Sequence, residues 1–159
     1  KCKGGIFPVW AATELMSFGQ VSKFFKNMVR EDRNKMSREF YNISSREYIE
    51  SWIQCAVVAR NIAAHGGRFY NRFLSPKIQL PNSLAGNGSL FWGYAYGIYM
   101  LLPPEKKNVF ISDLSRAISS HEYVLLRHIG FPNDWVQIMQ GNTQSARDGK
   151  RGDRELSLV

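Results

Sequence analysis

Hydrophobic residues recur along this chain at the three- and four-residue spacing of helices, and strand-like alternation is almost absent. Residues 8–19 begin with Pro8 and end with Gly19, which predicts a first helix. Residues 20–41 predict a helix or a pair of helices with a charged, solvated second half. Further helices are expected over 88–102, 104–119, 121–129 and 132–140.

The predicted helix with the clearest boundaries ends before Gly66-Gly67, which supplies the stop signal. At its start, Ser44 and Glu47 have the spacing of a capping box. Between these signals the apolar side chains form one stripe: Tyr48, Ile49, Trp52, Ile53, Ala56, Val57 and Ala59. The whole pattern predicts an all-α helical bundle in a single domain over residues 1–140, followed by a polar, flexible tail over 141–159.

Composition fits one compact domain, since 44% of the 159 residues are hydrophobic. The apolar run from Ser89 to Leu102 is shorter than the ~20 residues that cross a bilayer, so we interpret it as a buried helix and expect no membrane contact.

Cys2 and Cys55 are too few for a disulfide framework and lack zinc-site spacing, which favours the cytoplasm. We expect Cys55 to be a buried, inert thiol. The chain begins at Lys1 without an initiator Met, so we expect it to be the C-terminal part of a longer protein.

The formal net charge of +8 indicates an anionic partner. The distribution is more informative than the total, because no Asp or Glu occurs between Glu50 and Glu105. A segment without carboxylates argues locally against a magnesium or calcium site and against paired-carboxylate chemistry. It favours phosphate, although charge alone does not choose between nucleic acid and an anionic membrane surface. Our expectation is RNA as the partner, with no metal or cofactor.

Arg60, Asn61 and His65 form the candidate catalytic group. On a helix, Asn61 and His65 share a face, and the long side chain of Arg60 can reach the same place. Arg binds phosphate oxygens in pairs and stabilises the added charge of a pentavalent transition state, while His transfers protons near neutral pH. His65 also has a simpler interpretation, as a residue that caps the last turn of the helix.

RNA carries its own nucleophile, the 2′-hydroxyl, so cleavage requires a base, an acid and charge stabilisation. The expected products are a 2′,3′-cyclic phosphate and a 5′-hydroxyl. One His cannot easily act as both acid and base, whereas a two-fold dimer would bring a second copy of the group to the site. We therefore expect a homodimer.

The loop after the candidate group carries further expected RNA contacts, Arg68, Tyr70, Asn71, Arg72 and Lys77. Each has an alternative role. The cations are also explained as solvated side chains, Asn71 as a residue that satisfies loop backbone, and Tyr70 as an aromatic that packs the loop on the core.

The spacing of Arg60 and His65 is not specific by itself, because Arg116 and His121 repeat it. No Asn follows Arg116, however, and Ser119 with Glu122 has the spacing of a second capping box. We expect His121 to lie at a helix terminus without a catalytic role.

The longer string around Arg60 carries more information than the spacing. "ARNIAAHGGRFYNR" resembles the LRN-x-x-AH motif of the abortive-infection, Abi-like branch of the HEPN superfamily. Three further stretches resemble the family in the same order: "FPVWAATELMSFGQVSKFFKNM", "YIESWIQCAVVARN" and "HIGFPNDW". The resemblance spans residues 7 to 136.

This resemblance implies an all-helical HEPN fold, a dimer and, as in many members, a metal-independent ribonuclease that acts in phage defence or a toxin-antitoxin system. Arg60, Asn61 and His65 match the catalytic motif residue by residue, and an RNA or protein antitoxin becomes a further expected partner. Two departures matter. The helical region that usually precedes the Pro-x-Trp landmark is missing, and Tyr70 lies too far from His65 for the His-x-Tyr arrangement of some toxins.

Two alternatives to an enzyme stay open. A non-catalytic HEPN-like module would hold RNA or a regulatory partner without cutting it. A structural dimerisation domain would carry a basic surface without function.

Overall fold

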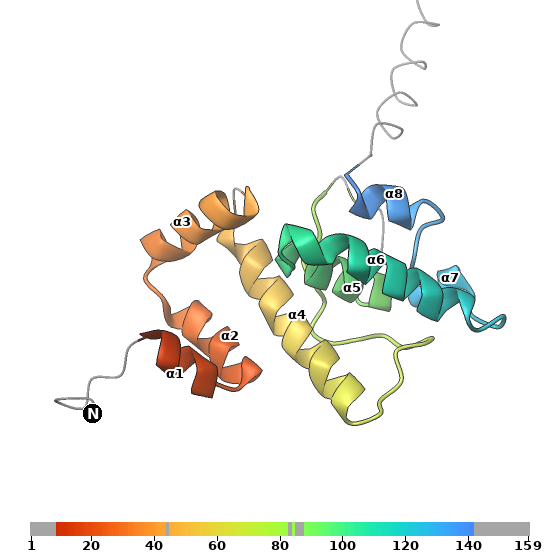
Figure 1. Ribbon diagram of the computed structural model, residues 1–159, viewed down its shortest axis with the longest axis horizontal. Coiled ribbons are helices and arrows are strands. Elements are labelled where there is room, and N and C mark those ends of the chain that lie inside the picture. Colours follow the sequence, from red (N-terminus) through yellow and green to blue (C-terminus); the bar gives the residue numbers. More distant parts are fainter. Residues whose placement is uncertain (1–8, 44, 83, 85–87, 142–159) are drawn as a thin grey trace, which may run out of the picture.

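The computed structural model describes residues 9–43, 45–82, 84 and 88–141 (Figure 1). Among these residues it contains helices and no strand, which confirms the all-α prediction. The tail predicted over 141–159 lies outside the described residues except for Gly141. The helices are α1 (Val9–Leu15), α2 (Phe18–Asn27), α3 (Arg30–Tyr41), α4 (Arg46–Ala64), α5 (Phe91–Leu101), α6 (Pro104–Ser119), α7 (Leu126–Ile129) and α8 (Trp135–Met139).

The first two helices meet earlier in the chain than the sequence pattern predicts. The hydroxyl of Ser17 accepts a hydrogen bond from the Gln20 backbone N–H at 3.3 Å, and the Gln20 side chain accepts one from the Ser17 N–H at 2.7 Å. This capping box starts α2, so Gly19 lies in the first turn of a helix and does not end one. The prediction of a helix over 8–19 was therefore wrong at its end, because the cap at Ser17 outweighs the apolar periodicity across it.

α4 is the central element of the fold. It packs against α2 and α3 on one side and against α5 on the other (Figure 1). Its predicted apolar stripe is confirmed in part, since Ile49, Trp52, Ala56 and Ala59 are buried, and Cys55 outside the stripe is buried as well. The N-cap is Ser45, whose hydroxyl accepts from the Glu47 N–H. The predicted cap Ser44 lies outside the described residues.

α5 confirms the buried helix predicted from the apolar run. Two of its glycines make room for neighbouring side chains: a Cβ at Gly93 would lie 2.6 Å from Ile78, and one at Gly97 would collide with Ile78 and approach Trp52. The Trp52 indole N–H donates to the Gln79 carbonyl at 2.8 Å, which fixes the connecting segment on α4. No helix within the described residues is long and apolar enough to span a membrane.

The end of the described chain is less helical than predicted. α6 continues through Ser119, and its C-cap is Ser120, so the predicted capping box of Ser119 and Glu122 does not exist. The helices expected over 121–129 and 132–140 shorten to α7 and α8. Between α7 and α8, Phe131 packs edge-on against the rings of Trp92 and Trp135. Aromatic packing thus holds this region where local helix signals are weak.

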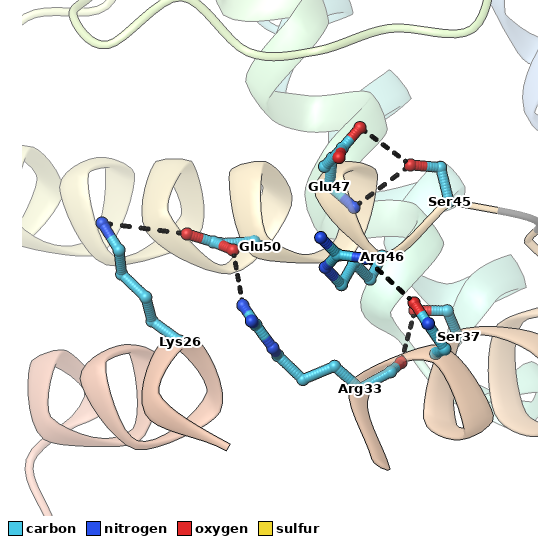
Figure 2. Close-up of polar contacts among 8 residues, drawn as sticks. Lys26, Arg33, Ser37, Ser45, Arg46, Glu47 and Glu50 are labelled. Carbon is cyan, nitrogen blue, oxygen red and sulfur yellow. Dashed lines mark hydrogen bonds and ion pairs between the residues drawn. The ribbon is translucent and has the colours of Figure 1, made fainter. Parts of the chain in front are cut away.

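The charged helix α3 is not wholly solvated, in contrast to its prediction. The Arg33 guanidinium donates to Glu50 of α4 at 3.1 Å, and its side chain is only 16% exposed. Lys26 of α2 approaches the other oxygen of Glu50 at 3.8 Å (Figure 2). One carboxylate of α4 therefore ties both preceding helices to the centre of the fold.

Candidate functional site

The candidate catalytic group lies where α4 ends. Arg60 and Asn61 stand in its last turns, and His65 is the C-cap residue. Gly66 has a φ of 64°, its N–H donates to the Ala63 carbonyl, and the Gly67 N–H donates to the Ile62 carbonyl at 2.7 Å. These bonds form a Schellman motif, so the predicted Gly66-Gly67 stop is confirmed. The motif fixes the backbone at His65 and directs the chain into the following loop.

Arg60 and Asn61 are brought together by a direct hydrogen bond. The Arg60 guanidinium donates to the Asn61 side-chain oxygen at 3.1 Å, and both side chains are exposed. This contact leaves the amide group of Asn61 and most of the guanidinium donors free to bind phosphate. The oxygen of Asn61 thus orients Arg60 in this structure.

His65 is exposed and sits one turn beyond Asn61, and the two are joined through the backbone. The His65 N–H donates to the Asn61 carbonyl at 3.1 Å. Within the described part of the chain, no side chain makes a hydrogen bond to the His65 imidazole. The ring is therefore open to a ligand, but none of the acids or bases that the structure describes is placed against it.

The loop after α4 is anchored through its aromatic residues. Phe69 packs on Phe91 of α5 with ring centroids 4.8 Å apart. The Tyr70 hydroxyl lies 2.7 Å from Nδ1 of His128 and donates to the Tyr123 carbonyl at 3.2 Å. Tyr70 thus packs the loop against the rest of the protein, which was the alternative to an RNA contact. Its contact with RNA stays a prediction.

The polar residues of the loop point into solvent. Arg68, Asn71 and Arg72 are exposed, and the Arg72 guanidinium donates to the Arg68 carbonyl at 3.4 Å, which brings these two arginines together. Asn71 adopts a φ of 49°, a conformation that Asn tolerates in turns. Lys77 is also exposed, on the segment that Trp52 fixes to α4, and no described contact joins it to the arginines.

His128 was missed as a partner of the loop. Its Nε2 accepts a hydrogen bond from Arg127 at 3.4 Å, so the tautomer protonated at Nδ1 can donate to Tyr70. The stretch "HIGFPNDW" drew attention to this region, but no signal in the sequence pairs His128 with a residue so distant along the chain.

Cys55 and His121 lie as expected. Cys55 is buried, and desolvation raises the pKa of its thiol to about 11. His121 follows the C-terminus of α6, where its Nδ1 lies 2.9 Å from the Ser120 hydroxyl. Neither residue contacts the group at the end of α4.

A family model described as Abi-like protein matches residues 1–71, a segment that ends within the loop after α4. No curated protein matches the chain. No solved structure matches it either. The match shows that residues 1–71 are similar to the Abi-like family, and it supports a role related to abortive infection.

Proposed function

We propose that this protein is a metal-independent endoribonuclease of the HEPN type that acts in the cytoplasm as a phage-defence or toxin-antitoxin effector. The observation that carries the proposal is the pairing of Arg60 with Asn61 at an exposed helix end, one turn before the open imidazole of His65. No carboxylate occurs between Glu50 and Glu105 to compete for these cations. Such a group suits a phosphodiester.

In the proposed reaction, a neutral His65 accepts the proton of the 2′-hydroxyl, and the 2′-oxygen attacks the adjacent phosphorus. Arg60 and the Asn61 amide hold the non-bridging oxygens as charge builds on them. The bond to the 5′-oxygen then breaks, and that oxygen takes up a proton. The products are a 2′,3′-cyclic phosphate and a 5′-hydroxyl.

The leaving 5′-oxygen needs a proton donor in addition to the base. Because no side chain of the described chain is placed against His65, we assign this role to His65 of a second copy in a two-fold dimer. Arg68 and Arg72 would then hold flanking phosphates beside each motif.

The test is cleavage of mixed-sequence single-stranded RNA in excess EDTA, with the product ends identified. His65→Ala should abolish the formation of cyclic-phosphate ends. His121→Ala is the matched control, because His121 has the same spacing from an arginine but lies at the end of α6. Equal cleavage by wild type and His65→Ala would refute the proposal.

A second candidate is a non-catalytic module that binds RNA or a protein antitoxin. The open imidazole of His65, without an orienting partner among the described residues, favours it. Uncut RNA that binds to wild type and His65→Ala with equal affinity would support this candidate.

A further inference from the structure

An apolar groove lies beside the candidate catalytic group. It has a volume of about 610 Å³ and is lined by residues of α2, α4, α5 and the loop after α4, together with Tyr41 at the end of α3. Its walls include Phe18, Ile53, Phe69, Ile98 and Leu101. Small-molecule sites occupy roughly 300–1,000 Å³ and are mostly apolar with a few placed polar groups, so this groove has the size and lining of a ligand site.

The groove has one charged lining residue, Arg60, whose side chain is exposed. Among its described lining residues, Arg60 is the only charged one, and no carboxylate is present. Arg60 donates to the uncharged side-chain oxygen of Asn61, so its charge is not neutralised by that contact. A guanidinium at the edge of an apolar hollow favours a ligand that brings an anion to that edge.

We propose that the groove binds a free long-chain monocarboxylate, a fatty acid whose acyl chain lies between α2 and α5 and whose carboxylate contacts Arg60. A monoanion balances the single cation of the lining, whereas a phosphate dianion would leave one charge unpaired. The two oxygens of a carboxylate also match the paired N–H groups of Arg60.

The groove can hold a chain of considerable length. A second hollow of about 310 Å³ shares Tyr41, Leu101 and Leu102 with it. The lining of this second hollow is mostly apolar, includes Lys107 and does not include Arg60. Each buried methylene should strengthen binding roughly fourfold. Dodecanoate is therefore expected to bind at least roughly a hundredfold more tightly than hexanoate, even where burial of the added methylenes is incomplete.

Bound carboxylate would compete with the RNA phosphate for Arg60. This second part rests on the proposed function, and it predicts that dodecanoate inhibits RNA cleavage. The binding itself does not rest on that function, because it requires only the groove and one guanidinium.

The experiment is calorimetric titration of the whole chain with dodecanoate below its micelle concentration. Saturable binding with one site per chain is expected. Ala63→Trp should abolish it, because Ala63 lines the groove and is exposed at its edge. Ala64→Trp is the matched control, since Ala64 is exposed and does not line the groove.

The same calorimetric titration tests the role of the Arg60 charge. Arg60→Leu should weaken dodecanoate binding about tenfold, while Arg68→Leu should leave it unchanged. Uncharged dodecanol should bind wild type about tenfold more weakly than dodecanoate. Phe18→Asp is a second variant of the groove lining, on α2. It should weaken dodecanoate binding, because the new carboxylate repels the carboxylate of the ligand.

Three results would overturn the inference: no saturable binding of dodecanoate, equal binding of dodecanoate and dodecanol, or unchanged binding in both Ala63→Trp and Phe18→Asp. A dimer seen by sedimentation that Ala63→Trp dissociates, without any binding of dodecanoate, would assign the groove to a second copy of the chain. His65→Ala separates this inference from the proposed function, because it should stop RNA cleavage and leave dodecanoate binding intact.

Discussion

The Tyr70 hydroxyl lies 2.7 Å from Nδ1 of His128, although 58 residues separate the two along the chain. Their rings also meet edge-on, with centroids 5.5 Å apart. The contact joins the loop that follows the candidate catalytic group to α7. The position of the loop arginines therefore depends on a part of the chain outside the matched residues 1–71.

Tyr70→Phe should destabilise the protein by about 1 kcal/mol, because it removes the bonds to His128 and to the Tyr123 carbonyl. Urea unfolding measures this loss, and hydrogen exchange at residues 68–72 should become faster. Tyr123→Phe is the control, because the Tyr123 side chain is 83% exposed and only its backbone carbonyl takes part. Equal unfolding midpoints for the two variants would contradict this role of Tyr70.

Glu50→Gln should cost about 1–3 kcal/mol of stability, because it removes the charge that faces Arg33 while that side chain stays only 16% exposed. Denaturant unfolding gives the value. Lys26→Ala tests the other half of the same cluster and should cost less than about 0.5 kcal/mol, since the Lys26 side chain is 70% exposed. A larger loss for Lys26→Ala than for Glu50→Gln would show that burial does not decide the strength of these contacts.

Gly66→Ala should cost about 1–2 kcal/mol, because an L-residue at a φ of 64° is strained. Gly66→Asn should restore part of that loss, since Asn tolerates the left-handed region. Gly141 provides a matched position, with a φ of 77° and open space around it, but it is distant in sequence from the candidate group. If Gly66→Ala lowers RNA cleavage and Gly141→Ala does not, the Schellman motif also positions His65.

Cys55 should be unreactive toward thiol reagents at pH 8 in the folded protein, since burial raises its pKa from 9.0 to about 11. The measurement uses Cys2→Ser, so that Cys55 is the only thiol, and denaturant should expose it to reaction. Rapid labelling of the folded protein would show that the thiol is accessible.

The same shift makes stability depend on pH in a defined direction. Because the pKa of Cys55 is raised in the folded protein, its contribution to the free energy of unfolding is complete below pH 9.0. This contribution is lost as the pH rises through about 11. Burial raises the pKa values of Tyr94 and Tyr96 as well, so these groups add to the same alkaline loss. Cys55→Ala should therefore flatten the decline of unfolding free energy over this range without removing it.

Residues with strong local signals were predicted well from the sequence. The stop at Gly66-Gly67 was found because a left-handed residue is needed to close a helix there, and the buried stripe of α4 was found from its period. Ser17 was missed because the apolar period continues across it. In contrast, Ser119 had the spacing of a cap, but α6 continues through it.

Contacts between distant segments had no such signal. The hydrogen bond of Tyr70 with His128 and the burial of Arg33 against Glu50 depend on how α7 and α3 approach the rest of the fold. Spacing rules describe one element at a time and do not contain that information. Consequently the members of the candidate site were predicted from sequence, whereas the anchoring of its loop required the structure.

Arg68 and Arg72 are the exposed arginines of that loop. If Arg68 and Arg72 hold phosphates, replacing both with Ala should weaken RNA binding for all sequences alike. The slope of log affinity against log salt should become less steep by about 0.7 for each phosphate contact removed from single-stranded RNA. Fluorescence titration at several salt concentrations, with His65→Ala as background so that the RNA stays intact, measures both effects. Arg116→Ala is the control, because Arg116 is paired with Asp113 at 2.6 Å on α6 and should leave the slope unchanged. An unchanged slope in the double variant would assign Arg68 and Arg72 to solvent, and the loop would then serve to position the end of α4.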